Sequence, residues 1–72
     1  MDEDAIFRSL VETDEAILRT ETRIVALQQG LTEAKAADDG GAIDLITFQI
    51  MRANELLIVL TKKRSTLYMK LP

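Results

Sequence analysis

The second half of this chain has a heptad pattern that runs without a slip over four heptads. From residue 43 to residue 71, the side chains of one row recur at alternating steps of three and four, and all but one of them are apolar. The row consists of Ile43, Ile46, Ile50, Ala53, Leu57, Leu60, Arg64, Leu67 and Leu71. This spacing predicts a long helix that packs lengthwise on another helix.

The first half of the chain has a similar row. It consists of Ile6, Leu10, Thr13, Ile17, Thr20, Ile24, Leu27, Leu31 and Ala34, and its spacing continues past Gly30. We therefore expect one helix that runs through this glycine, although a glycine in a helix interior costs ~1 kcal/mol relative to alanine. Asp2 or Asp4 is placed to cap the start of this helix, and Glu3 suits the positive end of the helix dipole.

The sequence Asp38-Asp39-Gly40-Gly41 separates the two rows. We expect the glycines to supply positive φ angles and the aspartates to cap helix ends. A connection this short joins antiparallel neighbours. The sequence therefore predicts an all-α fold, a two-helix antiparallel hairpin with helices at about 3–37 and 42–70, in a single domain over residues 1–72.

The composition excludes several kinds of chemistry. The chain has 72 residues and contains neither cysteine nor histidine. Disulfides and thiolate metal sites are therefore excluded, and the most common metal ligand and general base are missing. Asp38, Asp39 and Asp44 do not form a calcium loop, because Gln49 stands where such a loop has glutamate. We expect no catalytic residues, no metal site and no cofactor, and hence no enzyme.

The N-terminal sequence MDEDAIF is acidic and lacks the positive start and apolar core of a signal peptide. Polar residues also interrupt the apolar stretch from residue 42 to residue 60, and charges near the middle of a membrane span are costly. We therefore expect a cytoplasmic protein without a membrane-spanning helix.

Charge is distributed unevenly between the two halves. Residues 1–41 contain ten acidic and four basic residues, whereas residues 42–72 contain two acidic and five basic ones. A hairpin lays residue n near residue 80 − n, so it brings the bases of the second helix beside the acids of the first. We expect charge pairing among Asp14, Glu21, Lys62, Lys63 and Arg64. Exposed pairs of this kind contribute only ~0–1 kcal/mol each, so they select pairing direction more than they stabilise the fold.

The second helix has apolar residues outside its main row. They are Phe48, Met51, Ile58, Val59 and Met69. One partner helix cannot cover both sides, and soluble proteins rarely leave an apolar strip exposed. Two interpretations stay open: the strip is the second face of a homo-oligomeric core, most simply a four-helix bundle, or it is a docking surface for a helical protein partner.

A nucleic-acid interface is the alternative function. Lys62, Lys63, Arg64, Tyr68 and Lys70 form the only basic cluster, and a nucleic-acid-binding hairpin dimer would use it. The chain is acidic overall, with a net charge of −3, and has no extended basic face. Nucleic acid is therefore the less favoured partner.

With its acidic first helix, its Asp38-Asp39-Gly40-Gly41 turn and its apolar row from Ile43 to Leu71, the chain resembles in overall plan the small acidic helical hairpins of bacterial type III secretion systems. These include co-chaperones that guard a needle subunit, and the needle or inner-rod subunits, whose proline-bearing turn this chain lacks. Plasmid-regulatory hairpin dimers and small phage proteins fit the same outline. This likeness implies a non-catalytic adaptor, co-chaperone or assembly subunit that acts through apolar helix faces.

Overall fold

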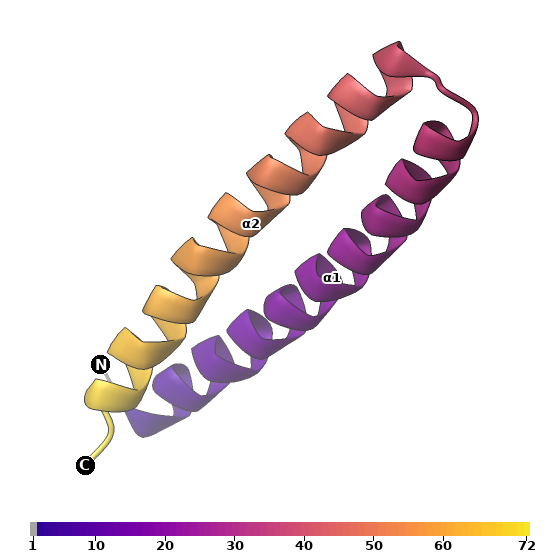
Figure 1. Cartoon of the computed structure of the whole chain (residues 1–72). Helices are drawn as coiled ribbons and strands as arrows, with labels where there is room; N and C mark the ends of the chain where they lie inside the picture. Colours follow the sequence, from indigo (N-terminus) through magenta and orange to yellow (C-terminus); the bar gives the residue numbers. More distant parts are fainter. Residues whose placement is uncertain (1) are drawn as a thin grey trace.

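Two long helices lie side by side in an antiparallel hairpin in the computed structural model, which describes residues 2–72 (Figure 1). Helix α1 spans Glu3–Ala36 and helix α2 spans Gly40–Met69. The two ends of the chain lie at the same end of the hairpin (Figure 1). The all-α hairpin predicted from the sequence is confirmed, and each helix boundary lies within two residues of its predicted position.

Each helix begins at an aspartate that caps its free N–H groups. The Asp2 carboxylate accepts a hydrogen bond of 2.7 Å from the Ala5 N–H, so Asp2 rather than Asp4 is the cap of α1. The Asp39 carboxylate accepts a hydrogen bond of 3.1 Å from the Ala42 N–H at the start of α2. Such caps satisfy backbone donors that have no partner within the helix.

The predicted role of the two glycines in the turn is wrong. Gly40 and Gly41 are the first residues of α2, and neither has a positive φ. Asp38 instead takes the left-handed conformation, with φ of 52°. The N–H of Asp39 donates to the Ala34 carbonyl at 3.0 Å, and the N–H of Asp38 donates to the Lys35 carbonyl at 3.1 Å. These two bonds form a Schellman motif, in which aspartate occupies the position that most proteins give to glycine.

The seam between the helices consists of the two rows that the sequence predicts. All eighteen row positions are buried or partly buried, and the neighbouring positions are mostly exposed. Helix α1 runs through Gly30 without a break, as expected. A Cβ atom at Gly30 would lie 3.6 Å from the Ile46 Cδ1 atom, an ordinary contact, so close helix approach does not require this glycine.

The most deeply buried part of the seam lies at the end that contains both termini. There Ile6, Leu10 and Leu67 form a buried cluster, and Leu71 packs against it. Further along, Thr13 and Thr20 occupy seam positions and are buried. Their hydroxyls donate to the carbonyls of Ser9 and Ala16, both at 2.7 Å, so neither is left without a partner. The threonines make the middle of the seam less apolar than its end.

The hairpin is an elongated rod. Its radius of gyration is 16.3 Å, whereas a compact chain of this length has ~11 Å. The Cα atoms extend over 53 × 14 × 12 Å. Within residues 2–72, neither helix has a stretch long and apolar enough to span a bilayer. A rod of two helices leaves most of its side-chain positions outside the seam.

The turn geometry predicts opposite effects for two substitutions at one residue. Asp38→Gly should stabilise the hairpin by about 0.5–1 kcal/mol because glycine adopts positive φ without strain. Asp38→Ala should destabilise it, because alanine lacks both that freedom and the polar side chain that tolerates the conformation. Urea denaturation followed by circular dichroism at one fixed protein concentration measures the effect of both substitutions.

Gly40→Ala tests the same turn from the start of α2. Since a Cβ there meets no atom within 4 Å, it should stabilise, and a loss would contradict this turn.

The seam predicts very different costs for two truncations on the last turns of α2. Leu67 is 5% exposed and Met69 is 85% exposed. Leu67→Ala should cost about 2–4 kcal/mol, because it removes buried methyl groups from the cluster of Ile6 and Leu10. Met69→Ala should change the free energy of unfolding by less than about 0.5 kcal/mol. Equal effects of the two variants in thermal denaturation would contradict the packing.

Candidate protein-binding surfaces

The outer strip of α2, defined as Phe48, Met51, Ile58, Val59 and Met69, is fully on the surface. Each of its five side chains is at least half exposed. Since the seam row of α2 faces α1, the strip lies on the sides of α2 that the hairpin does not cover. Leu45, another exposed apolar residue, extends the strip toward the turn. The hairpin fold therefore leaves these side chains available to a further molecule.

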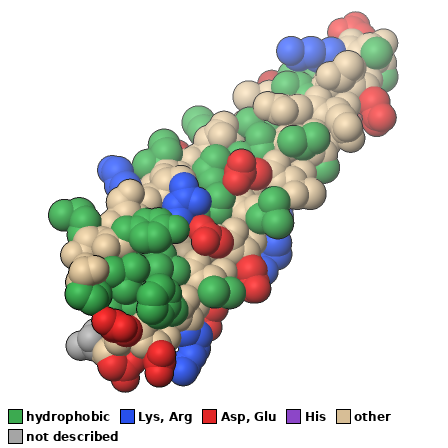
Figure 2. All heavy atoms as spheres, turned by 90° about the horizontal axis from the view of Figure 1, so that it is seen from below, with side chains coloured by type: hydrophobic (Ala, Val, Ile, Leu, Met, Phe, Trp, Pro, Cys, Tyr) green, Lys and Arg blue, Asp and Glu red, His purple; other side chains and the backbone are tan. Residues whose placement is uncertain are grey.

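Helix α1 has an exposed apolar row of its own. We call it the acidic–apolar face and define it as Phe7, Val11, Asp14, Leu18, Glu21 and Val25. Its four apolar side chains are 52–66% exposed, and its two carboxylates are exposed between them. Figure 2 shows exposed hydrophobic side chains gathered toward the end of the hairpin where the termini lie. Each residue of this row directly follows a residue of the seam row, so its spacing of three and four is present in the sequence.

A shallow groove runs between the two helices. It lies on the flank of the seam opposite to the acidic–apolar face. One part of it has a volume of about 390 Å³ and is lined by residues of both helices. A neighbouring hollow shares three of these residues and continues the groove along α1. The combined lining is Ala16, Arg19, Thr20, Arg23, Phe48, Gln49, Arg52, Ala53, Leu56 and Leu60. The groove exists because small seam residues, Thr20 and Ala53, meet where larger side chains would fill the space.

We call this feature the arginine groove, since its charged side chains are Arg19, Arg23 and Arg52. The Arg52 guanidinium lies over the ring of Phe48, with its carbon 6.0 Å from the ring centroid. It also lies 4.0 Å from Glu55, an exposed pair that contributes little. Arg19 and Arg23 take part in no ion pair within 4.0 Å among residues 2–72. The groove therefore combines an apolar floor with free positive charge.

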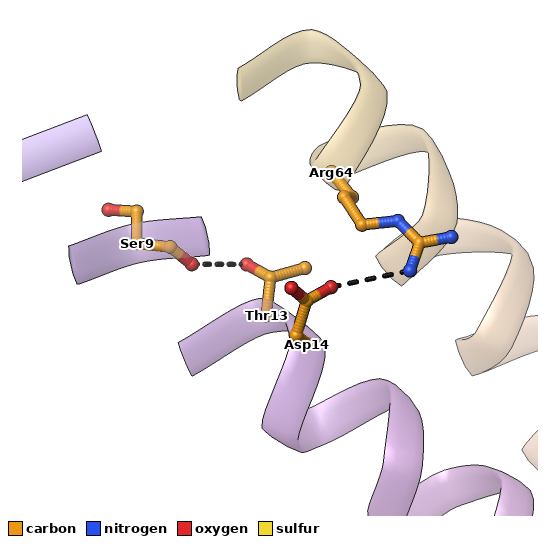
Figure 3. A network of polar contacts seen from close by, with 4 residues as sticks. All are labelled: Ser9, Thr13, Asp14 and Arg64. Atoms are coloured by element: carbon orange, nitrogen blue, oxygen red, sulfur yellow. Dashed lines mark hydrogen bonds and ion pairs between the residues drawn. The ribbon is translucent and has the colours of Figure 1, made fainter. Parts of the chain in front are cut away.

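One charge pair connects the two helices. Arg64 on α2 extends toward α1, and its Nη1 atom donates to a carboxylate oxygen of Asp14 at 3.3 Å (Figure 3). Arg64 occupies a seam position, so its guanidinium reaches this carboxylate from the edge of the seam. The side chains of Arg64 and Asp14 are 38% and 51% exposed. Water screens the pair, which orients the helices more than it stabilises them.

The other residues considered for charge pairing lie on different sides of the hairpin. Within residues 2–72, Glu21, Lys62 and Lys63 take part in no ion pair within 4.0 Å. Lys62 is on the outer side of α2, because it lies two positions from the seam residues Leu60 and Arg64. Lys63 is on the flank of the arginine groove, whereas Glu21 is on the other flank. Because Arg64 lies opposite Asp14, Lys62 and Lys63 lie at the height of that turn of α1, whereas Glu21 lies about two turns further along the rod.

Other candidate chemistry can be described briefly. Among the described residues, no three acidic side chains gather where they could hold a metal ion. The basic cluster is divided, because Arg64 turns to Asp14 while Lys62, Lys63 and Lys70 remain exposed. In comparisons with protein-family models, with curated proteins and with solved structures, nothing matches this chain. Its function must therefore be argued from its surfaces.

The exposed pair between the helices predicts a small, salt-sensitive coupling. Asp14→Asn and Arg64→Gln should each destabilise the hairpin by less than about 1 kcal/mol, since both side chains are partly solvated. Urea denaturation of the two single variants and the double variant gives the coupling energy. It should shrink as salt is raised from 10 mM to 500 mM. A coupling that is unaffected by salt would show that the pair is more strongly desolvated than its exposure indicates.

Proposed function

We propose that this chain is a non-catalytic protein–protein interaction module that acts through the apolar faces of its helices. It serves as a small cytoplasmic adaptor, co-chaperone or assembly subunit, of the kind found in secretion systems and phages. The proposal rests on one observation above all. Among residues 2–72, twelve large hydrophobic side chains are at least half exposed, whereas seven hydrophobic residues are buried, two of them alanines.

An excess of exposed over buried hydrophobic side chains is unfavourable for an isolated soluble chain. Exposed apolar surface costs ~25 cal/mol per Å², and monomers seldom keep large contiguous patches of it. The apolar side chains also occur in rows along the rod, as a helical partner requires. Methionine and phenylalanine in the outer strip are adaptable anchors at interfaces. A protein partner that covers these rows accounts for the surface more fully than solvent does.

The nucleic-acid alternative has less support. Its basic cluster loses Arg64 to Asp14, and the remaining lysines stand beside a helix with an excess of acidic residues. Phosphate binding requires a continuous basic surface, and the acidic side chains of α1 would repel the nucleic-acid backbone. In that interpretation the apolar rows would serve only to join the two hairpins of the dimer.

Site-specific photo-crosslinking in cells that produce the chain tests the proposal. A photoreactive residue at Met51, in the outer strip, should give crosslinked protein adducts. The same residue at Gln29, an exposed polar position on the outer side of α1, should give few. Adding Ile58→Asp to the Met51 probe should abolish the adducts because a charge then disrupts the apolar contact.

The control adds Thr22→Asp to the Met51 probe. It introduces the same charge at an exposed polar position of α1 and should leave the adducts unchanged. Circular dichroism checks that every variant keeps the helix content of the wild type. Equal crosslinking from Met51 and Gln29, or none from either, would contradict an interaction surface on the outer strip.

A further inference from the structure

We infer that copies of this chain bind one another head to tail, with the acidic–apolar face of one copy docked in the arginine groove of the next. This inference rests on the proposed interaction function and names a second copy of the chain as a partner. It depends on the charges of two surfaces, on their positions around the hairpin and on the area that the hairpin exposes.

The two surfaces are complementary in chemistry. The face presents the carboxylates of Asp14 and Glu21 between apolar side chains, and Glu21 has no basic partner within 4.0 Å among residues 2–72. The groove presents Arg19 and Arg23, which also lack such a partner, beside the apolar side chains of Phe48 and Leu56. Docking would place the free Glu21 carboxylate against free guanidinium groups and cover apolar side chains on both sides.

The face is longer than the groove that it would occupy. From Phe7 to Val25 the face extends over ~27 Å of a single straight helix, at 1.5 Å per residue. The groove from Phe48 to Leu60 is ~18 Å long by the same measure. A helix ridge of this length can lie along the whole groove. Helix-in-groove docking is a common way in which amphipathic helices are recognised.

The surfaces lie on opposite flanks of the seam, so one copy can offer both at once. On α1, Glu21 follows the seam residue Thr20, whereas Arg23 precedes the seam residue Ile24. A helix turns about 100° per residue, which puts these two side chains on different flanks. An interface between two different surfaces is heterologous, and it builds a ring or an open chain of copies.

The exposed area agrees with an interface of standard size. The hairpin has an accessible surface of 5308 Å², whereas a compact monomer of its mass exposes ~4,500 Å². The excess is ~800 Å², about the area that one partner buries in one typical stable interface, and a copy inside a head-to-tail chain would bury two such areas.

A symmetric dimer through the acidic–apolar face is less favourable. It would bring the two Glu21 carboxylates into one interface, together with both copies of Asp14. Arg64 neutralises only Asp14 in each copy. Like charges in an apolar interface oppose association, and the head-to-tail arrangement avoids them.

Reciprocal charge reversal tests the inference with the purified chain. The face variant combines Leu18→Lys with Glu21→Lys, and the groove variant combines Arg19→Glu with Arg23→Glu. All four side chains are exposed, so circular dichroism should show wild-type helix content for both. Sedimentation velocity at tens of micromolar should show wild-type species larger than a dimer that grow with concentration. Each variant alone should associate at least about tenfold more weakly, because like charges then meet across the interface.

An equal mixture of the two variants decides the matter. When the two variants alternate along a chain, each contact joins either a wild-type face to a wild-type groove or a reversed face to a reversed groove. Assembly should therefore return to the wild-type level. A groove variant that assembles like the wild type would overturn the inference in favour of a face-to-face dimer. A wild-type chain that stays monomeric at 8.1 kDa would overturn it as well. The proposed interaction function would survive that result if Met51 still crosslinks to a different protein.

Discussion

The lengthwise contact between α1 and α2 is the interaction on which the rest of this structure depends. It buries one row of side chains from each helix, and its apolar core is strongest where Ile6, Leu10 and Leu67 meet near the termini. A contact between two helices can cover only one sector of each, because the remaining positions point away from the partner. Among residues 2–72, every large apolar residue outside the two rows is consequently exposed.

The seam is less apolar in its middle than at the end where the termini lie. The hydroxyls of Thr13 and Thr20 donate hydrogen bonds to backbone carbonyls of α1. Both side chains can therefore be buried without a polar partner on α2. Thr20 and Ala53 are small, and the groove opens beside them. These small seam residues therefore also shape the arginine groove, where arginines surround an apolar floor. Small seam residues beside an open groove fit a chain that buries its remaining apolar side chains by binding another molecule.

Much of the fold could be predicted from the sequence. The alternation of three and four residues identified all positions of the seam, including Arg64, and the spacing past Gly30 correctly indicated an unbroken helix. Capping aspartates were also recognisable, since their side chains act on backbone groups three residues away. The turn was assigned to the wrong residues. Asp38 takes the positive φ because α1 ends at Ala36, which makes Asp38 the residue after the C-cap, and the two glycines then start α2.

The sequence by itself determined the two helices, their pairing direction and the rows that face each other, because each depends on spacings within one helix or on the shortness of the turn. The tertiary structure decided which residues of α1 and α2 share a flank of the seam. Arg23 and Arg52 lie far apart in the sequence, and only the rotation of both helices about the seam puts them in one groove. The same rotation puts Glu21 and Lys63 on different flanks of the seam. Such neighbours depend on the relative orientation of two helices, which no local spacing records.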